Sequence, residues 1–215
     1  MARFIDAATQ RPVAIWNADL LCHHTAGTII GEAIVLRTGS SVTHIGLAVQ
    51  TNLISAWGPG REPIPMDVGA LGGGVFPVPI ENEIAMGSLI SVLRLTPAAE
   101  QAMELRSDDW RAAIARHALW CCGRIHYDDA GLLEQLLPRW PLIEAALGNR
   151  DTDLDTATRV ICGELASAEY RERAIDLVPD HVDQATWPAD LWRSPLLMVV
   201  AQQLAIETGD TRGNP

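Results

Sequence analysis

The pattern of apolar and polar positions divides the chain into a β-rich first part and a helical second part. Short β-branched runs bounded by glycine and proline predict strands at 42–49, 52–57, 74–80 and 88–95. Residues 28–37 instead repeat their apolar side chains at helical spacing and predict a helix. The pair Gln50-Thr51 separates the first two strand-like runs and predicts a hairpin between them.

The pattern becomes helical from Pro97, a residue that suits the first turn of a helix because no backbone N–H is needed there. The predicted helices cover residues 98–105, 108–122, 128–137, 142–147 and 158–173, with further elements at 188–190 and 196–206. This order predicts an α+β fold in one domain, residues 1–206. The polar tail, 207–215, is expected to be disordered.

The composition is that of a globular chain. With 48% hydrophobic and 20% charged residues among 215, it can bury a core without disulfides or structural metals. No apolar run approaches the roughly 18–20 residues that a membrane span needs, and no signal peptide is visible at the start. We therefore expect a cytoplasmic protein with no stable membrane insertion.

The charge balance excludes one class of partner. The 16 basic residues, all arginine, stand against 27 acidic ones, for a formal net charge of −11. Nucleic-acid binding needs a concentrated basic surface to neutralise phosphates, so no nucleic-acid partner is expected. The same charge disfavours an anionic wall polymer or an anionic membrane, by repulsion.

The four cysteines predict neither a disulfide framework nor a metal site. Cys22-His23-His24 and Cys121-Cys122 are too contiguous for one tetrahedral ion, because adjacent side chains diverge. Cys121 and Cys122 are interpreted as small apolar residues of a helix. No metal and no cofactor are expected. The histidines interpreted as structural or solvated are His23, His24, His117 and His181.

Cys162 and His44 are the candidates for chemistry. Cys162 is predicted near the start of a helix, where the dipole and unpaired N–H groups favour a thiolate. His44 lies in a strand and shares its face with the small residues Gly46 and Ala48, which leaves room beside it. The alternatives are a buried structural cysteine and a core histidine bonded to a backbone carbonyl. A Cys–His pair joined by the fold activates a thiol for acyl transfer.

Five short segments resemble, in the same order, motifs of one enzyme family. They are Ala18-Asp19-Leu20-Leu21-Cys22 ("GDLLL", with Ala for Gly), Ser40 to Leu47 ("SxxSHVGI", with Thr43 for Ser), Gly123 to Asp128 ("GxxYD"), Cys162-Gly163-Glu164-Leu165 ("CSEL", with Gly for Ser) and Trp187 to Pro195 ("PADLxxSP"). The family is the circularly permuted papain-like cysteine hydrolases, relatives of the NlpC-type cell-wall peptidases. Each motif is short, but together they span most of the chain.

The resemblance implies a permuted papain-like (NlpC-like) fold, with an antiparallel sheet packed against the Cys-bearing helix and added helices. It implies that Cys162 attacks a carbonyl carbon as a thiolate and that His44 holds the pair and protonates the leaving group. Tyr127 would line the site or assist the oxyanion. Its alternative role is a packed aromatic with a hydrogen-bonded hydroxyl.

The residue that orients His44 is a departure from the family pattern. The family usually places a polar residue, often Glu, on the strand after the His strand, and counting along the sequence puts Ser55 in that position. A serine adds no negative charge and stabilises an imidazolium less than a carboxylate does. Three possibilities follow: Ser55 suffices, Glu62 or Asp67 supplies the charge, or activity is weak or lost.

The expected function is hydrolysis of an amide, in a peptide or cell-wall type of substrate, through an acyl-enzyme on Cys162. One alternative is an acyltransferase or thioesterase acting on lipid acyl groups. The other is a catalytically silent binding or phage-particle module. A bacterial or phage protein acting on a wall without a signal would need another route, in a phage particle or as an injected effector. The sequence does not define the oligomeric state.

Overall fold

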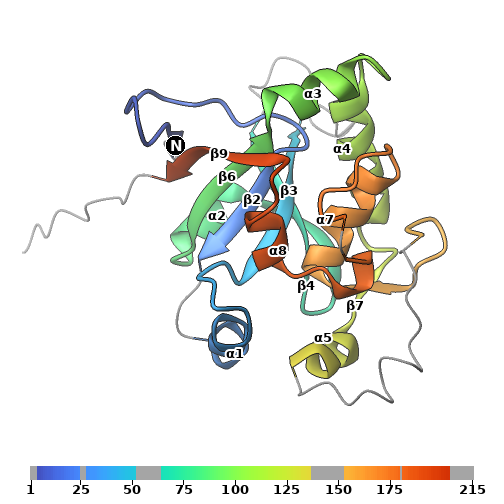
Figure 1. Cartoon of the computed structure of the whole chain (residues 1–215). Helices are drawn as coiled ribbons and strands as arrows, with labels where there is room; N and C mark the ends of the chain where they lie inside the picture. Colours follow the sequence, from blue (N-terminus) through green and yellow to red (C-terminus); the bar gives the residue numbers. More distant parts are fainter. Residues whose placement is uncertain (1–3, 25–27, 52–63, 137–152, 180, 204–215) are drawn as a thin grey trace, which may run out of the picture.

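A seven-stranded sheet forms the centre of the protein (Figure 1). The computed structural model describes residues 4–24, 28–51, 64–136, 153–179 and 181–203. The strand order is β1-β9-β6-β2-β3-β4-β5, with every neighbouring pair antiparallel. The strands are β1 (Phe4–Ile5), β2 (Leu20–His24), β3 (His44–Gln50), β4 (Pro65–Leu71), β5 (Gly74–Pro79), β6 (Leu89–Leu95) and β9 (Leu197–Gln203). A separate parallel pair joins β7 (His126–Tyr127) to β8 (Arg159–Val160).

Helices cover the sheet on both faces. They are α1 (Ile29–Thr38), α2 (Ile80–Ala85), α3 (Pro97–Glu104), α4 (Trp110–Cys121), α5 (Asp129–Leu136), α7 (Cys162–Arg171), the 3-10 helix η2 (Asp183–Ala185) and α8 (Pro188–Trp192). Figure 1 shows α4 and α7 beside the sheet, and both pack against β3. On the other side α2 lies against β4 and β5.

Period-two alternation sorts the strand residues between two apolar clusters. On β2, Leu20 and Cys22 join the larger cluster, which includes α4 and α7, whereas Leu21 joins the smaller one with Ile80 of α2. On β3, Ile45 belongs to the larger cluster and Ala48 to the smaller. Both faces of the central strands are therefore buried.

The predicted α+β class is confirmed, with a large antiparallel sheet and several helices. Pro97 opens α3 as expected, and the Thr96 side chain caps it by accepting a hydrogen bond from the Ala99 N–H at 3.4 Å. The expectations for 52–57, 142–147 and the tail 207–215 lie outside the described residues.

The hairpin predicted at Gln50-Thr51 is wrong. Gln50 still belongs to β3 and pairs with Pro65 of β4, and the Thr51 N–H bonds to the carbonyl oxygen of Ile64 at 3.1 Å. The chain therefore returns alongside β3 as β4, a strand that the sequence pattern did not predict. Asp67 and Gly69 interrupt its apolar run and hide the alternation.

The predicted helix at 158–173 begins four residues too early. Arg159–Val160 forms β8, and the N–H groups of His126 and Asp128 bond to the carbonyl oxygens of Thr158 and Val160, each at 3.0 Å. Pairing to β7 holds this segment extended, so the helix begins at Cys162. The shift places Cys162 in the first position of α7.

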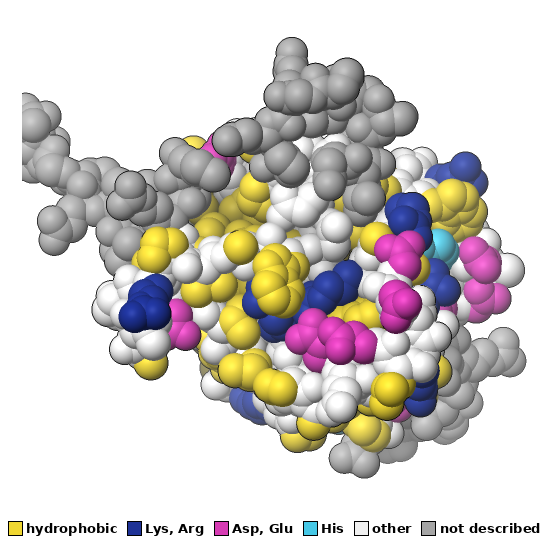
Figure 2. All heavy atoms as spheres, turned by 90° about the horizontal axis from the view of Figure 1, so that it is seen from above, with side chains coloured by type: hydrophobic (Ala, Val, Ile, Leu, Met, Phe, Trp, Pro, Cys, Tyr) yellow, Lys and Arg dark blue, Asp and Glu magenta, His cyan; other side chains and the backbone are white. Residues whose placement is uncertain are grey.

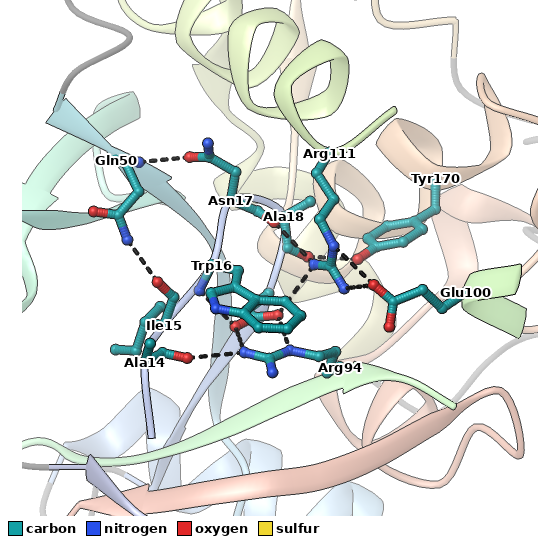
Figure 3. A network of polar contacts seen from close by, with 11 residues as sticks. Ala14, Ile15, Trp16, Asn17, Ala18, Gln50, Arg94, Glu100, Arg111 and Tyr170 are labelled. Atoms are coloured by element: carbon teal, nitrogen blue, oxygen red, sulfur yellow. Dashed lines mark hydrogen bonds and ion pairs between the residues drawn. The ribbon is translucent and has the colours of Figure 1, made fainter. Parts of the chain in front are cut away.

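A buried ion network holds the start of β2 in place (Figure 3). The fully buried Asp19 accepts hydrogen bonds from Arg94 at 2.6 and 2.8 Å and from Arg111 at 3.3 Å. It also accepts the Trp16 N–H at 2.8 Å. The hydroxyl of Tyr170, near the end of α7, donates to the Ala18 carbonyl oxygen. The motif aspartate is therefore a structural residue that ties the sheet to α7.

Replacing Asp19 with alanine should be strongly destabilising, because it leaves Arg94 largely buried without a carboxylate partner and removes one of the two carboxylates that Arg111 contacts. We expect a loss of about 3–5 kcal/mol in the free energy of unfolding, measured by urea denaturation. Asp109→Ala, which removes an exposed ion pair to Arg116, is the control and should cost under about 1 kcal/mol. Equal effects of the two variants would contradict this role for Asp19.

Candidate active site

Cys162 occupies the first turn of α7. The preceding residue, Ile161, is extended and caps the helix, and its N–H donates to the Glu164 side chain at 3.1 Å. Burial raises the pKa of Cys162 to about 11, although hydrogen bonds to the sulfur from the backbone N–H groups of Ile45 and Gly163 act to lower it. The sulfur therefore lies against β3 at the residue next to His44.

Gly163 stands where the "CSEL" motif has serine, and the structure leaves no room for a side chain at this position. A Cβ atom at this position would lie 2.2 Å from the carbonyl oxygen of Thr186. The backbone before α8 thus approaches α7 too closely for any side chain.

His44 begins β3 and belongs to a buried polar cluster. Its ring meets that of His23 edge to face, with the centroids 5.0 Å apart, and the His23 Nε2 lies 2.6 Å from Asp67 Oδ2. The other oxygen of Asp67 and the His44 Nε2 are buried without a hydrogen-bond partner among the described residues. Strands β2, β3 and β4 therefore bring the side chains of His23, His44 and Asp67 together at one end of the sheet.

Two glycines make this convergence possible. A Cβ on Gly46 would lie 1.8 Å from Asp67 Oδ1, and a Cβ on Gly69 would lie 2.7 Å from His44 Nε2. The small residue beside His44 noted in the sequence thus makes room for a carboxylate from the neighbouring strand.

The pKa values of the two histidines in the cluster are shifted in opposite directions. Burial is the largest influence and acts to lower the pKa of His23, but the hydrogen bond to Asp67 together with the charges of Asp67 and Glu83 outweighs burial and raises the pKa. Burial lowers the pKa of His44 to about 4, and the charge of His23 acts in the same direction. The raised pKa of His23 favours its cationic form, whereas His44, with a pKa of about 4, is neutral at neutral pH.

Cys162 and His44 are neighbours around the backbone of β3 and are not a bonded pair. Ile45, whose N–H bonds the sulfur, packs in the cluster that contains Cys162, whereas Gly46 faces Asp67 on the His44 side. No hydrogen bond within the described residues joins the sulfur to the imidazole. With pKa values near 11 and 4, the resting groups are a neutral thiol and a neutral imidazole.

The other expected site residues fall in two groups. Tyr127 is half-buried on β7 against the core, and burial raises its pKa, with a smaller contribution from Cys162. Its ring therefore lies near the thiol. Ser55 and Glu62 lie outside the described residues. Asp67, the remaining candidate to orient His44, is on the strand next to β3, with an oxygen turned toward Gly46.

Sequence reasoning missed His23, which was interpreted as structural or solvated. It is 2% exposed and lies directly opposite His44 in the β2–β3 register. The available signal was that His23 closes one apolar strand run and His44 opens the next. Antiparallel pairing places the end of one strand beside the start of its neighbour.

Two clusters among the described residues bring three possible metal-ligand atoms within 4.8 Å of one another: His23-His44-Asp67 and His117-Cys121-Glu169. In the first, the His23 nitrogen and an Asp67 oxygen are only 2.6 Å apart. Two ligands of one tetrahedral zinc ion are about 3.4 Å apart, so this contact is a hydrogen bond and does not fit a shared ion.

A cavity of about 720 Å³ lies at the opposite end of the sheet, lined by residues that include Trp16, Gln50 and Arg111. β2 runs from this end to His23, so the cavity is remote from Cys162. Figure 2, which views the molecule from above Figure 1, shows basic, acidic and apolar side chains interleaved on the exposed face. None of the described residues that line the cavity is a cysteine.

Comparison with known proteins identifies a fold neighbour. No protein-family profile and no curated protein matches the chain. The chain is similar to a crystal structure described as metalloprotein yiiX from Escherichia coli O157:H7, DUF1105. The TM-score is 0.56 with 16% identity, over 88% of this chain and 98% of the other. At this identity the likeness concerns the fold alone.

Among the described segments, none of the helices combines the length and the apolar character needed to span a bilayer.

Substituting Gly46 with alanine should disrupt the cluster, because the new methyl group would occupy the position of the Asp67 carboxylate. We expect a loss of about 1–3 kcal/mol in unfolding free energy and a lower pKa for His23, followed by NMR titration. Gly72→Ala is the control, since no atom lies within 4 Å of a Cβ built there. An unchanged His23 titration in Gly46→Ala would contradict the arrangement.

Alkylation of the cysteines should be slow at neutral pH and fastest at Cys162. Its pKa of about 11 leaves a thiolate fraction of about 10⁻⁴ at pH 7, rising about tenfold per pH unit. Cys122, with its pKa raised to about 12 by burial, should label later. Iodoacetamide labelling mapped by mass spectrometry checks this order. Rapid labelling of Cys162 already at pH 6 would show an ion pair with His44 instead.

Proposed function

We propose that the protein is a permuted papain-like cysteine hydrolase that cleaves an amide bond through an acyl-enzyme on Cys162. The observation that carries the proposal is the position of Cys162, at the first turn of α7 with its sulfur hydrogen-bonded by the N–H next to His44. The motif order and the antiparallel sheet against a Cys-bearing helix support it. The substrates that we propose are peptides or cell-wall type amides.

In this proposal the neutral pair reacts in one concerted step. Once the His44 imidazole turns toward the sulfur, Cys162 attacks the carbonyl carbon while its proton passes to His44, which acts as the general base. The backbone N–H groups at the start of α7 stabilise the oxyanion. The imidazolium then protonates the leaving amine, and a thioester remains on Cys162. His44 next takes a proton from water, which hydrolyses the thioester and restores the thiol.

Asp67 is the residue that we assign to orient and support His44. Its negative charge acts to raise the pKa of His44 and hence favours the imidazolium formed during acylation. Asp67 would replace the Ser55 suggested by counting, because the carboxylate supplies the charge that a serine lacks. Tyr127 would line the site.

The fold neighbour is described as a metalloprotein, but the proposed reaction uses no ion. The His23–Asp67 contact does not fit a shared metal ion, and His44 is needed as a base. Treatment with EDTA should therefore leave the hydrolysis rate unchanged.

Acyl transfer from lipids is the second candidate, and a feature of α1 favours it. The side chains of Ile29 and Leu36 are 89% and 88% exposed, and Ile30 is 52% exposed. An apolar surface of this kind suits contact with acyl chains. Faster reaction with long-chain thioesters than with peptides would favour this function over amide hydrolysis.

An acyl-enzyme trap tests the proposal. Incubation with an activated short-chain ester should give a stoichiometric acyl adduct on Cys162, detected by peptide mass spectrometry. His44→Gln should slow acylation by about 10²–10⁴-fold, because the general base is lost. Cys122→Ser, which removes a half-buried thiol on α4, is the control and should acylate normally.

Three outcomes are distinguished by this trap. Loss of the adduct in Cys162→Ala but not in Cys122→Ser supports the nucleophile. No adduct on Cys162 at any pH up to 10 would overturn catalysis and favour a silent binding module of the same fold. An adduct that forms equally fast in His44→Gln would reject His44 as the base.

A further inference from the structure

A second cluster of reactive side chains lies between α4 and α7, away from Cys162. His117 and Cys121 are one turn apart on α4, and Glu169 and Glu172 are three residues apart at the end of α7. Residues at these spacings share one face of a helix. Because the two helices pack together, four side chains of types that bind transition metals face one another.

The distances within the cluster match those between ligands of one ion. His117 Nδ1 lies 3.1 Å from Glu169 Oε2 and 3.3 Å from Glu172 Oε2, and Cys121 Sγ lies 3.8 Å from Glu169 Oε1. Tetrahedral zinc, with bonds of about 2.0–2.3 Å, separates its ligand atoms by about 3.4 Å for nitrogen and oxygen and about 3.6 Å for sulfur and oxygen. One ligand atom each from His117, Cys121 and Glu169 already lies within 4.8 Å of the others, so small side-chain movements would bring these three onto one ion, with Glu172 beside His117 as the fourth ligand.

The burial of the cluster also favours a cation. Glu169 and Cys121 are fully buried, and the side chains of His117 and Glu172 are 15% and 25% exposed. Burial raises the pKa of both carboxyl groups, with His117 and Arg173 as the positive charges acting against it. Two carboxylates and a thiol therefore share a poorly solvated space.

We propose that His117, Cys121, Glu169 and Glu172 form a binding site for a divalent transition-metal ion of the zinc type. Binding deprotonates the Cys121 thiol and the His117 Nδ1, releasing these protons to solvent. The His117 Nε2 lies 3.4 Å from Asp155, so this carboxylate can accept the second ring N–H. A carboxylate that orients a ligating histidine in this way is a common partner of zinc sites.

Cobalt binding tests the site without reference to activity. Titrating the metal-free full-length protein with Co²⁺ should give one equivalent of tetrahedral binding, with visible absorption and a thiolate-to-cobalt charge-transfer band. Cys121→Ser should abolish the charge-transfer band, and Glu169→Gln should weaken binding by about tenfold or more.

The adjacent cysteine provides a matched control. Cys122 bonds to its own helix, with its sulfur 3.4 Å from the Ala118 carbonyl oxygen, so Cys122→Ser should keep the band. Cys162→Ser should keep it as well. No tetrahedral spectrum in the wild-type protein would overturn the site, and so would a band lost in Cys162→Ser but retained in Cys121→Ser.

A second readout covers the case in which Cys121→Ser folds poorly. Zn²⁺ should raise the melting temperature of the wild-type protein and of Cys122→Ser, but not that of His117→Gln, which retains the thiol and both carboxylates. An equal rise in His117→Gln would place the ion elsewhere and overturn the proposal. The result is independent of whether Cys162 forms an acyl-enzyme.

Discussion

The burial of α7 on every side is the constraint on which the rest of the structure depends. All nine residues from Cys162 to Tyr170 are buried, including Glu164, Ser167 and Glu169. Polar side chains in such a helix must find partners, because an unpaired buried polar group is costly. Glu164 accepts the Ile161 N–H, Ser167 donates to Asp183, and Glu169 bonds to His117.

Along its length α7 contacts three other parts of the molecule. Its first turn carries Cys162 against β3, its last turn reaches the Asp19 network through Tyr170, and its outer side meets α4 through Glu169. The position of the thiol is thus set by contacts along the whole helix.

The end of the sheet near Cys162 has its own balance of charge. The His23–Asp67 pair is buried beside His44, which stays neutral because burial and the charge on His23 both disfavour a second cation. The glycines at 46 and 69 permit this arrangement, because any side chain there would overlap with Asp67 or His44.

The sequence by itself determined the α+β class and the start of α3 at Pro97, and it predicted Cys162 and His44 as the candidates for chemistry, because periodicity, capping and local composition act over a few neighbouring positions. The tertiary structure alone decided that β4 follows β3, that α7 begins at Cys162, and that Asp67 and His23 join His44. It also brought Cys121 next to Glu169, across 48 residues of sequence. Such contacts depend on which strands pair and which helices pack, and these choices are made by burial over the whole chain.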